Sequence, residues 1–473
     1  MPRRAHWIAI GLGLSAAVGV VAAWSGQPAP AAWTAAVATL CAFWWVTEAI
    51  PIPATSLVPM AVLPTVGVLT GKQVGEAYGS PLILLLLGGF LLSAAMERSG
   101  AHRRLAVAMV RACAAGSQSR GVSGRRLVIG FMLASSVLSM WVSNSATTLM
   151  LLPIALAALE RSGDRRLTVA VLLGIAYAAS IGGVTTPIGT PPNLLCLQEL
   201  APLVGEEPTF ATWIGWAGPV SAAMLPIAAW WLTRGLPATA DITLPKLDAW
   251  RPAEVRTLAV FAVTALLWVT RREPLGGWSD CLGLPGATDA GVALLAVLTL
   301  FVLPSGDPVE AGGEPRVGAD RLLDWESAVR IPWGILLLFS GGMVLAKGFT
   351  ESGLDASVGA ALGGLGSAPP WLLVTGMCLA VTFLTEVTSN TAVTALLMPV
   401  LATTSAATGL DPRLLMVPAA ASASFAFMLP VATAPNAAVY GAGVPVREMT
   451  RRGFALNLFG AAVISAIFVW RFG

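Results

Sequence analysis

Apolar segments long enough to cross a bilayer, about 20 residues each, recur along most of the chain with short breaks between them. Backbone in hydrocarbon must satisfy its own hydrogen bonds, and a helix does so within one segment. We predict eleven spanning helices, near residues 7–24, 31–50, 52–70, 80–97, 167–200, 211–233, 255–271, 287–304, 332–350, 414–443 and 453–470. The 473-residue chain has only 11% charged residues, too few for a soluble surface of this size. The sequence therefore predicts an all-α polytopic membrane protein.

Two further apolar segments, 127–159 and 371–402, are too long for one span. Each carries a Ser-Asn pair near its middle, Ser143-Asn144 in the first and Ser389-Asn390 in the second. A polar pair at this point favours a break in the helix, and broken backbone is tolerated at membrane depth only where it faces protein or water. We therefore predict two re-entrant hairpins whose tips end inside the membrane.

Basic residues are distributed unevenly between the predicted loops. With the N-terminus in the cytoplasm, most of the 28 Lys and Arg residues lie on the cytoplasmic side; the exceptions are Lys72, Arg271, Arg272, Lys347, Arg413 and Arg471. This bias follows the positive-inside rule and predicts insertion in the inner (plasma) membrane with the C-terminus outside. The basic, apolar start of the chain also fits a signal peptide, but its apolar run is long for one, so we expect a retained first helix.

The chain contains an internal repeat. SNSATTLMLLP at 143–153 matches SNTAVTALLMP at 389–399, and each motif is followed by a Pro-Asn break, TPIGTPPN ending at Asn193 and PVATAPN ending at Asn436. An odd number of predicted spans separates the two units, so they face opposite ways in the membrane. Inverted repeats with paired broken helices are typical of secondary transporters, whose site lies where the repeats meet.

The broken helices supply the chemistry of such a site. A helix interrupted inside the membrane presents unpaired carbonyl groups at one cut end and unpaired N–H groups at the other. Carbonyl, hydroxyl and amide oxygens suit a small hard cation, whereas N–H dipoles and hydroxyls suit a carboxylate. An alternative is that the Ser and Thr hydroxyls only donate back to the preceding helical turn, as they often do in membrane helices.

At these residues the sequence resembles a known family. The two Ser-Asn motifs, the GTPPN and ATAPN breaks and the segment WWVTEAIPIPATSLVP are similar to those of the divalent anion:sodium symporter family, from about residue 31 to the end of the chain. The resemblance implies transport of a dicarboxylate, citrate or sulfate. It also implies a homodimer in which each protomer has a scaffold domain and a transport domain that crosses the membrane as an elevator.

The resemblance further implies one sodium site per repeat, with the anion between the two sites. The first sodium site would use Ser139, Ser143, Asn144 and Gly189, and the second Thr385, Thr388, Asn390 and Ala432. The anion would contact Asn144, Ser145, Thr190, Asn390, Thr391 and Thr433. Ser145 departs from the family pattern, which usually has Thr here, so we expect a slightly roomier pocket.

The repeats and the resemblance together divide the chain. Residues 1–30 form an N-terminal segment with the first helix, and 31–126 the scaffold part of repeat 1. Residues 127–200 form the transport part of repeat 1, and 201–370 hold scaffold and connecting helices, with repeat 2 beginning near 251. Residues 371–473 form the transport part of repeat 2 and the last helix.

We interpret the chain as a sodium-coupled symporter that imports a dicarboxylate of the succinate, malate or fumarate class. A dicarboxylate or citrate exchanger of the same fold and a sodium-sulfate symporter remain alternatives. The exchanger would need fixed positive charge at the breaks, and no Lys, Arg or His occurs there. The sequence shows no HExxH or GxSxG motif, so an intramembrane enzyme is not expected, and a net charge of +3 gives nucleic-acid binding little support.

Two acidic residues lie within predicted spans. Glu386 stands three residues before Ser389, so it either braces the second hairpin tip or accepts a proton. Glu48 precedes Pro51 at the end of a span, where we expect an interfacial or helix-end partner.

Overall fold

The structure is a computed structural model that describes residues 2–114, 123–205, 208–236, 242, 249–272, 276–306, 320–362 and 369–473. Within these ranges the fold is entirely helical, and its only β-type pairing is an isolated bridge between Pro304 and Arg321. The predicted all-α class is therefore confirmed.

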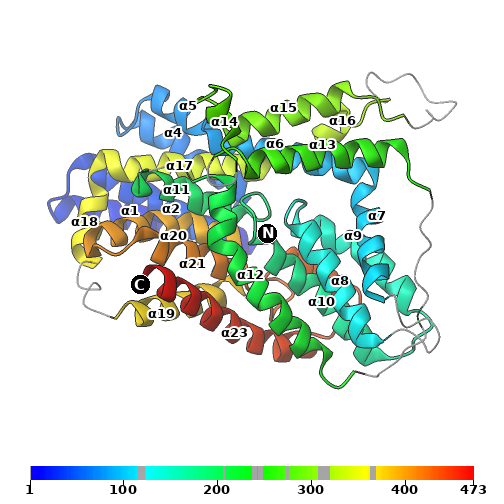
Figure 1. The fold of residues 1–473 in the computed structure, drawn as a ribbon. Helices are drawn as coiled ribbons and strands as arrows, with labels where there is room; N and C mark the ends of the chain where they lie inside the picture. Colours follow the sequence, from blue (N-terminus) through cyan, green and yellow to red (C-terminus); the bar gives the residue numbers. More distant parts are fainter. Residues whose placement is uncertain are drawn as a thin grey trace.

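One set of helices, here called the frame group, contains both N-terminal helices and the helices that pack around α17 and α6 (Figure 1). Its members are α1 (Pro2–Trp24), α2 (Ala29–Thr47), α3 (Ile52–Thr55), α4 (Leu57–Thr65), α5 (Gly71–Tyr78), α6 (Pro81–Ser99), α13 (Pro252–Val269), α14 (Trp278–Cys281), α15 (Asp289–Val302), α16 (Trp325–Ala328) and α17 (Trp333–Ser352). Helix α17 packs against α2, α4 and α5, and α6 packs against α13 and α15.

A second set, the hairpin group, holds both Ser-Asn motifs and both Pro-Asn breaks. Its members are α8 (Gly124–Ser139), α9 (Asn144–Leu159), α10 (Arg165–Gly183), α11 (Pro191–Val204), α12 (Phe210–Thr233), α19 (Pro370–Thr385), α20 (Asn390–Thr408), α21 (Pro412–Ala423), α22 (Ala434–Gly441) and α23 (Val446–Phe472). The remaining helices, α7 (Ala101–Ala114) and α18 (Leu354–Leu362), follow α6 and α17 respectively, and α7 extends from the frame group toward α8 (Figure 1).

Both predicted hairpins break at their Ser-Asn pairs. Helix α8 ends at Ser139 and α9 begins at Asn144, and the second hairpin repeats this arrangement with α19 and α20. Ser143 caps α9 by accepting a hydrogen bond from the Ala146 N–H, and Ser389 caps α20 in the same way. Capping satisfies one of the N–H groups that a helix start leaves unpaired, which explains why the motif places a serine directly before the amide.

The two Pro-Asn breaks interlock the repeats. Helix α10 stops at Gly183 and the chain resumes as α11 at Pro191, while α21 stops at Ala423 and resumes as α22 at Ala434. The second half of each broken helix then packs against the other repeat: α11 against α20 and α21, and α22 against α9 and α10. The two hairpins and two broken helices thus form one packed unit, with α10 buried along nearly its whole length.

In the described ranges, nine helical segments are long and apolar enough to cross a bilayer. They are α1, α2, α5 with α6, α10, α12, α13, α17, α20 and α23. Three predicted spans differ because their helices are short: 52–70 holds α3 and α4, 287–304 holds α15, and 414–443 is divided between α21 and α22. Conversely, α20 was expected as a hairpin arm but has spanning length. A multi-pass membrane protein is confirmed, whereas the number eleven stays a prediction.

Candidate functional site

A cavity of about 760 Å³ lies where both hairpin tips and both helix breaks meet. Its remaining wall comes from the frame group: the end of α2, the middle of α6 and the start of α17. The first residues of α9, α11, α20 and α22 all line it, so four helix N-termini converge on one space. Since each N-terminus carries partial positive charge, the cavity favours an anion without any basic side chain.

The predicted site residues gather at this cavity. Every residue predicted to contact the anion lines it: Asn144, Ser145, Thr190, Asn390, Thr391 and Thr433. So do most of the predicted sodium ligands, namely Ser143, Asn144, Gly189, Thr388, Asn390 and Ala432. The other two, Ser139 and Thr385, are fully buried at the ends of α8 and α19, behind the tips. Their binding roles stay predictions.

The first hairpin tip is connected to the first helix break through Asn144. Ser139 Oγ lies 2.5 Å from the Asn144 amide. In the amide orientation that pairs donors with acceptors, Asn144 Nδ2 donates to the carbonyl oxygens of Ala179 at 3.2 Å and Gly189 at 3.3 Å. Glycine permits this approach, because a Cβ on Gly183 would stand 2.5 Å from the nearest atom of the Asn144 amide group. Serine hydroxyl, amide and backbone oxygens are thereby brought together at one tip.

Aromatic stacking holds the same tip against neighbouring helices. The Trp141 ring, in the loop between α8 and α9, stacks on Phe210 of α12 at 5.7 Å and on Trp268 of α13 at 6.4 Å between ring centroids. Trp141 also lines the cavity. The tip therefore contacts the frame group through a packed aromatic cluster rather than through an ion pair.

Two buried asparagines satisfy the carbonyl groups that the helix breaks release. Asn193 Nδ2 donates to Gly183 O at 2.9 Å and Thr186 O at 2.7 Å, and Asn436 Nδ2 donates to Ala426 O and Leu429 O, both at 3.0 Å. Both side chains are fully buried. Sequence reasoning recognised them as the ends of the break motifs but assigned them no role; their recurrence after proline in both repeats was the available signal.

Glu386 braces the second break. Its carboxylate accepts hydrogen bonds from Met428 N at 2.9 Å, Leu429 N at 2.8 Å and Asn457 Nδ2 at 2.7 Å, and it is 3% exposed. These donors belong to the loop between α21 and α22 and to α23. Of the two roles that the sequence left open, the hydrogen bonds support bracing.

We expect Glu386→Gln to destabilise the folded protein by about 2 kcal/mol, because an NH₂ group would face N–H donors that are buried. The Tm of the purified protein in detergent should fall by several degrees, whereas Glu326→Gln, at an exposed position of α16, should leave it nearly unchanged. Equal Tm values for the two variants would contradict the bracing role.

Several threonines follow the back-bonding alternative. Thr148, Thr388 and Thr394 each donate to the carbonyl four residues earlier. For Thr388 this does not remove its predicted ligand role, because a hydroxyl that has donated its proton still offers lone pairs to a cation. Asn390 differs from them, since its buried Oδ1 has no hydrogen-bond partner among the described residues.

Glu48 was expected to be a helix-end residue with a partner, and only the first half of that expectation holds. It is the C-cap of α2, but within the described part of the chain it has no hydrogen bond or ion pair. Its exposed side chain instead lines the cavity, where it is the only ionisable group among the lining residues described.

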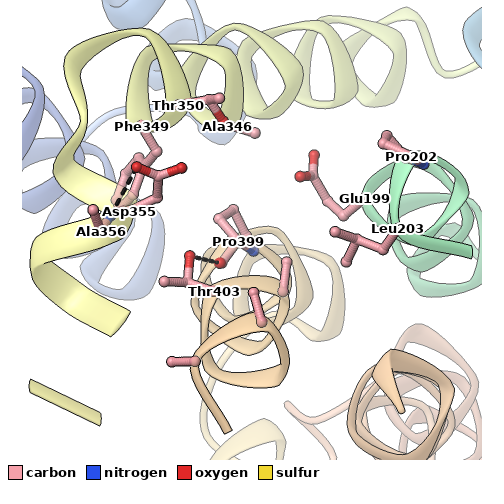
Figure 2. A pocket seen from close by; sticks show the side chains of 13 residues that line it. Glu199, Pro202, Leu203, Ala346, Phe349, Thr350, Asp355, Ala356, Pro399 and Thr403 are labelled. Carbon is pink, nitrogen blue, oxygen red and sulfur yellow. Dashed lines mark hydrogen bonds between the residues drawn. The ribbon is translucent and has the colours of Figure 1, made fainter. Parts of the chain in front are cut away.

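A second cavity, of about 630 Å³, lies between α17 and α18 on one side and α11 and α20 on the other (Figure 2). Glu199 and Asp355 extend into it from opposite walls (Figure 2). Thr403 donates to the Pro399 carbonyl, and the Asp355 carboxylate accepts from the Ala356 N–H. None of the predicted site residues lines this space, so the cavity at the hairpin tips is the candidate site.

Comparison with known proteins agrees with this architecture. Residues 42–420 match the citrate transporter family. Sodium-dependent dicarboxylate transporter SdcS of Staphylococcus aureus strain bovine RF122 / ET3-1 is 37% identical over 454 residues, covering 91% of this chain and 84% of that protein. The protein of the same name from strain NCTC 8325 / PS 47 is 36% identical over the same shares.

A solved structure shares the fold. The YdaH transporter of Alcanivorax borkumensis has a TM-score of 0.57 and 16% sequence identity, covering 85% of this chain and 86% of that one. Paired hairpins, paired helix breaks and these sequence matches lead to one assignment: the chain belongs to the citrate transporter family, as a divalent anion:sodium symporter type of membrane transporter.

Proposed function

We propose that this protein is a sodium-coupled symporter that imports a dicarboxylate of the succinate, malate or fumarate class. The observation that carries the proposal is the convergence of four helix N-termini and two Ser-Asn tips on one cavity. Relatives that are 37% identical are named sodium-dependent dicarboxylate transporters, which supports the same coupling ion and substrate class.

The cavity offers separate chemistry for the two cargoes. The N–H groups at the starts of α9, α20 and α22, with the hydroxyls of Ser145, Thr391 and Thr433, suit the two carboxylates. Sodium prefers oxygen, and one proposed site combines Ser139, Ser143, Asn144 and the Gly189 carbonyl. The other combines Thr385, Thr388, Asn390 and the Ala432 carbonyl. Asparagines 144 and 390 would contact both a cation and the anion.

The proposed movement is an elevator within a homodimer. The transport domain would comprise 127–200 and 371–473, and the scaffold 31–126 and most of 201–370. The interlocked packing of the hairpin group supports a single moving unit. Helix α12, which this division counts among the connecting helices, packs against α8, α10 and α23. We further propose inverted repeats, a cytoplasmic N-terminus and an outside C-terminus, from the distribution of basic residues.

Exchange and sulfate transport are the competing functions. An exchanger binds its anion without a cation, so it needs fixed positive charge in the site, and the described residues that line the cavity include no Lys, Arg or His. A dicarboxylate also needs two groups of hydrogen-bond donors on opposite sides of the cavity, one for each carboxylate, and the two hairpin tips supply them. The compact sulfate ion does not require donors from both tips.

Uptake of labelled succinate into proteoliposomes tests the proposal. Replacing external sodium with choline should reduce uptake at least about tenfold, because the proposed sites would then lack the charge that offsets the dianion. Unlabelled malate should compete, and sulfate should not. Sodium-independent uptake that requires succinate inside the vesicles would instead establish an exchanger, and competition by sulfate alone would establish a sulfate carrier.

A further inference from the structure

Glu48 occupies a position whose local conformation is unfavourable for glutamate. As the C-cap of α2 it has φ 47°, and it is the only non-glycine residue in the described ranges with positive φ. Glycine or asparagine is the usual choice in this left-handed conformation, and a negative charge at a helix C-terminus opposes the helix dipole. Such outliers persist where the surrounding structure serves a function.

The position of Glu48 affects the charge of the cavity. Glu48 is exposed and lines the cavity that contains both hairpin tips, and no described residue forms an ion pair with it. The converging helix N-termini make the cavity attractive to an anion even before a cation binds. A symporter must suppress such binding, because a dianion that crosses without its cations runs down the substrate gradient that uptake has built. A fixed negative charge opposite the tips would suppress it.

We propose that Glu48 sets the charge balance of the cavity: it weakens the binding of a dianion and strengthens the binding of sodium. This inference rests on the proposed symport and adds a charge-selective residue to it. The repulsion between the Glu48 carboxylate and the dianion is present whether or not sodium is bound, because charge–charge energies add. Without sodium the carboxylate makes the cavity a poor site for a dianion, and bound sodium supplies the attraction that compensates for the repulsion.

Coulomb's law gives the size of the effect. For a unit charge and a dianion on the order of 8 Å apart in a water-like dielectric, repulsion weakens binding about sixfold. The same charge strengthens the binding of a monovalent cation about twofold to threefold. Because the cavity is open to solution, salt screens both effects.

The experiment is calorimetric titration of succinate into the full-length protein in detergent, at low and at saturating sodium. Glu48→Gln should bind succinate about fivefold tighter than wild type at low sodium and low salt, and in a separate titration it should bind sodium about twofold to threefold more weakly. At saturating sodium the higher ionic strength should reduce the difference in succinate affinity by screening. Raising choline chloride at fixed low sodium should remove most of the difference, since screening acts on charge and not on shape. A residue with a merely structural role would produce no such salt dependence.

Two further variants separate charge from backbone conformation. Glu48→Gly also removes the charge but suits the positive φ, so it should fold well and show the same fivefold tightening as Glu48→Gln. Glu199→Gln makes the identical chemical change in the second cavity (Figure 2) and should leave succinate affinity within about twofold of wild type.

The outcomes distinguish this inference from the proposed function. If wild-type protein binds succinate more tightly with sodium, but Glu48→Gln and Glu48→Gly match it at low sodium and low salt, the role of Glu48 is refuted and symport stands. If wild-type affinity does not depend on sodium, both the symport proposal and this inference fail.

Discussion

Asn144→Ala and Asn390→Ala are each expected to reduce succinate uptake about a hundredfold or more while the protein remains folded. Each amide lies at the start of a hairpin helix and lines the cavity, where we propose that it contacts both a sodium ion and the anion. Losing two interactions of charged cargo, each worth about 1.5 to 3 kcal/mol, exceeds the ~2.7 kcal/mol that a hundredfold change requires. Neither repeat can compensate, because the anion spans both.

Matched controls exist one turn along the same helices. Thr148→Ala and Thr394→Ala remove hydroxyls that donate only to the carbonyls of Asn144 and Asn390 within the helix. These variants should transport at rates close to wild type. Uptake would be measured at equal protein density, with Tm as the test of folding. Rapid uptake by either asparagine variant would show that the Ser-Asn motif is structural, as the back-bonding alternative holds.

The sequence predicted the helical elements and their breaks well because both depend on local properties. Apolar length sets where a helix can span, and a Ser-Asn pair or a Pro-Asn pair marks where it cannot continue. Local signals also located the residues at the tips. The Ser-Asn and Pro-Asn motifs occur in the same order in both repeats, and equivalent motifs of two repeats related by symmetry are expected to lie close together. The cavity accordingly contains every residue predicted for the anion.

Properties that depend on packing between distant segments were not predictable in this way. Nothing local indicates that α11 packs on the second hairpin and α22 on the first. The same holds for Asn193 and Asn436, whose carbonyl partners become available only when the preceding helix ends early. Glu48 is the clearest case, because its position at a helix end was predicted and its exposure to the cavity depends on where α2 ends relative to the tips.

Hydrophobicity alone also does not distinguish a continuous span from a broken helix. Helices α21 and α22 are each too short to cross a bilayer, yet the single apolar segment 414–443 that contains them was counted as one span. Burial explains the difference, because α21 is shielded by neighbouring helices and needs no lipid-facing length. A broken helix therefore satisfies the apolar pattern of a span without being a continuous one.

Sodium should tighten succinate binding, and succinate should tighten sodium binding by the same factor, which we expect to lie between about 5-fold and 150-fold. The first tip gives the physical reason. Asn144 is held between Ser139 on α8 and the Gly189 carbonyl of the helix break, and the Thr186 hydroxyl of that break donates to the Met140 carbonyl of the tip. A cation bound among these oxygens would fix the amide and the start of α9 together.

The second tip should contribute more of this coupling than the first. Asn390 Oδ1 has no hydrogen-bond partner among the described residues, whereas the Asn144 amide already has several. Sodium at the second tip would therefore give a buried oxygen the partner it lacks, and the amide fixed in this way would lower the entropic penalty of binding the anion next. If the sodium sites and the anion site bind independently and only move together, sodium should not change the affinity for succinate.

Calorimetric titration of succinate at low and high sodium, with choline chloride holding ionic strength constant, measures the coupling. The reverse titration of sodium with and without succinate must yield the same factor, because binding free energies are linked reciprocally. Thr391→Ala should weaken succinate binding similarly at both sodium concentrations, since its hydroxyl is proposed to contact only the anion. Equal Kd values for wild-type protein at low and high sodium would eliminate a shared tip, even if transport itself required sodium.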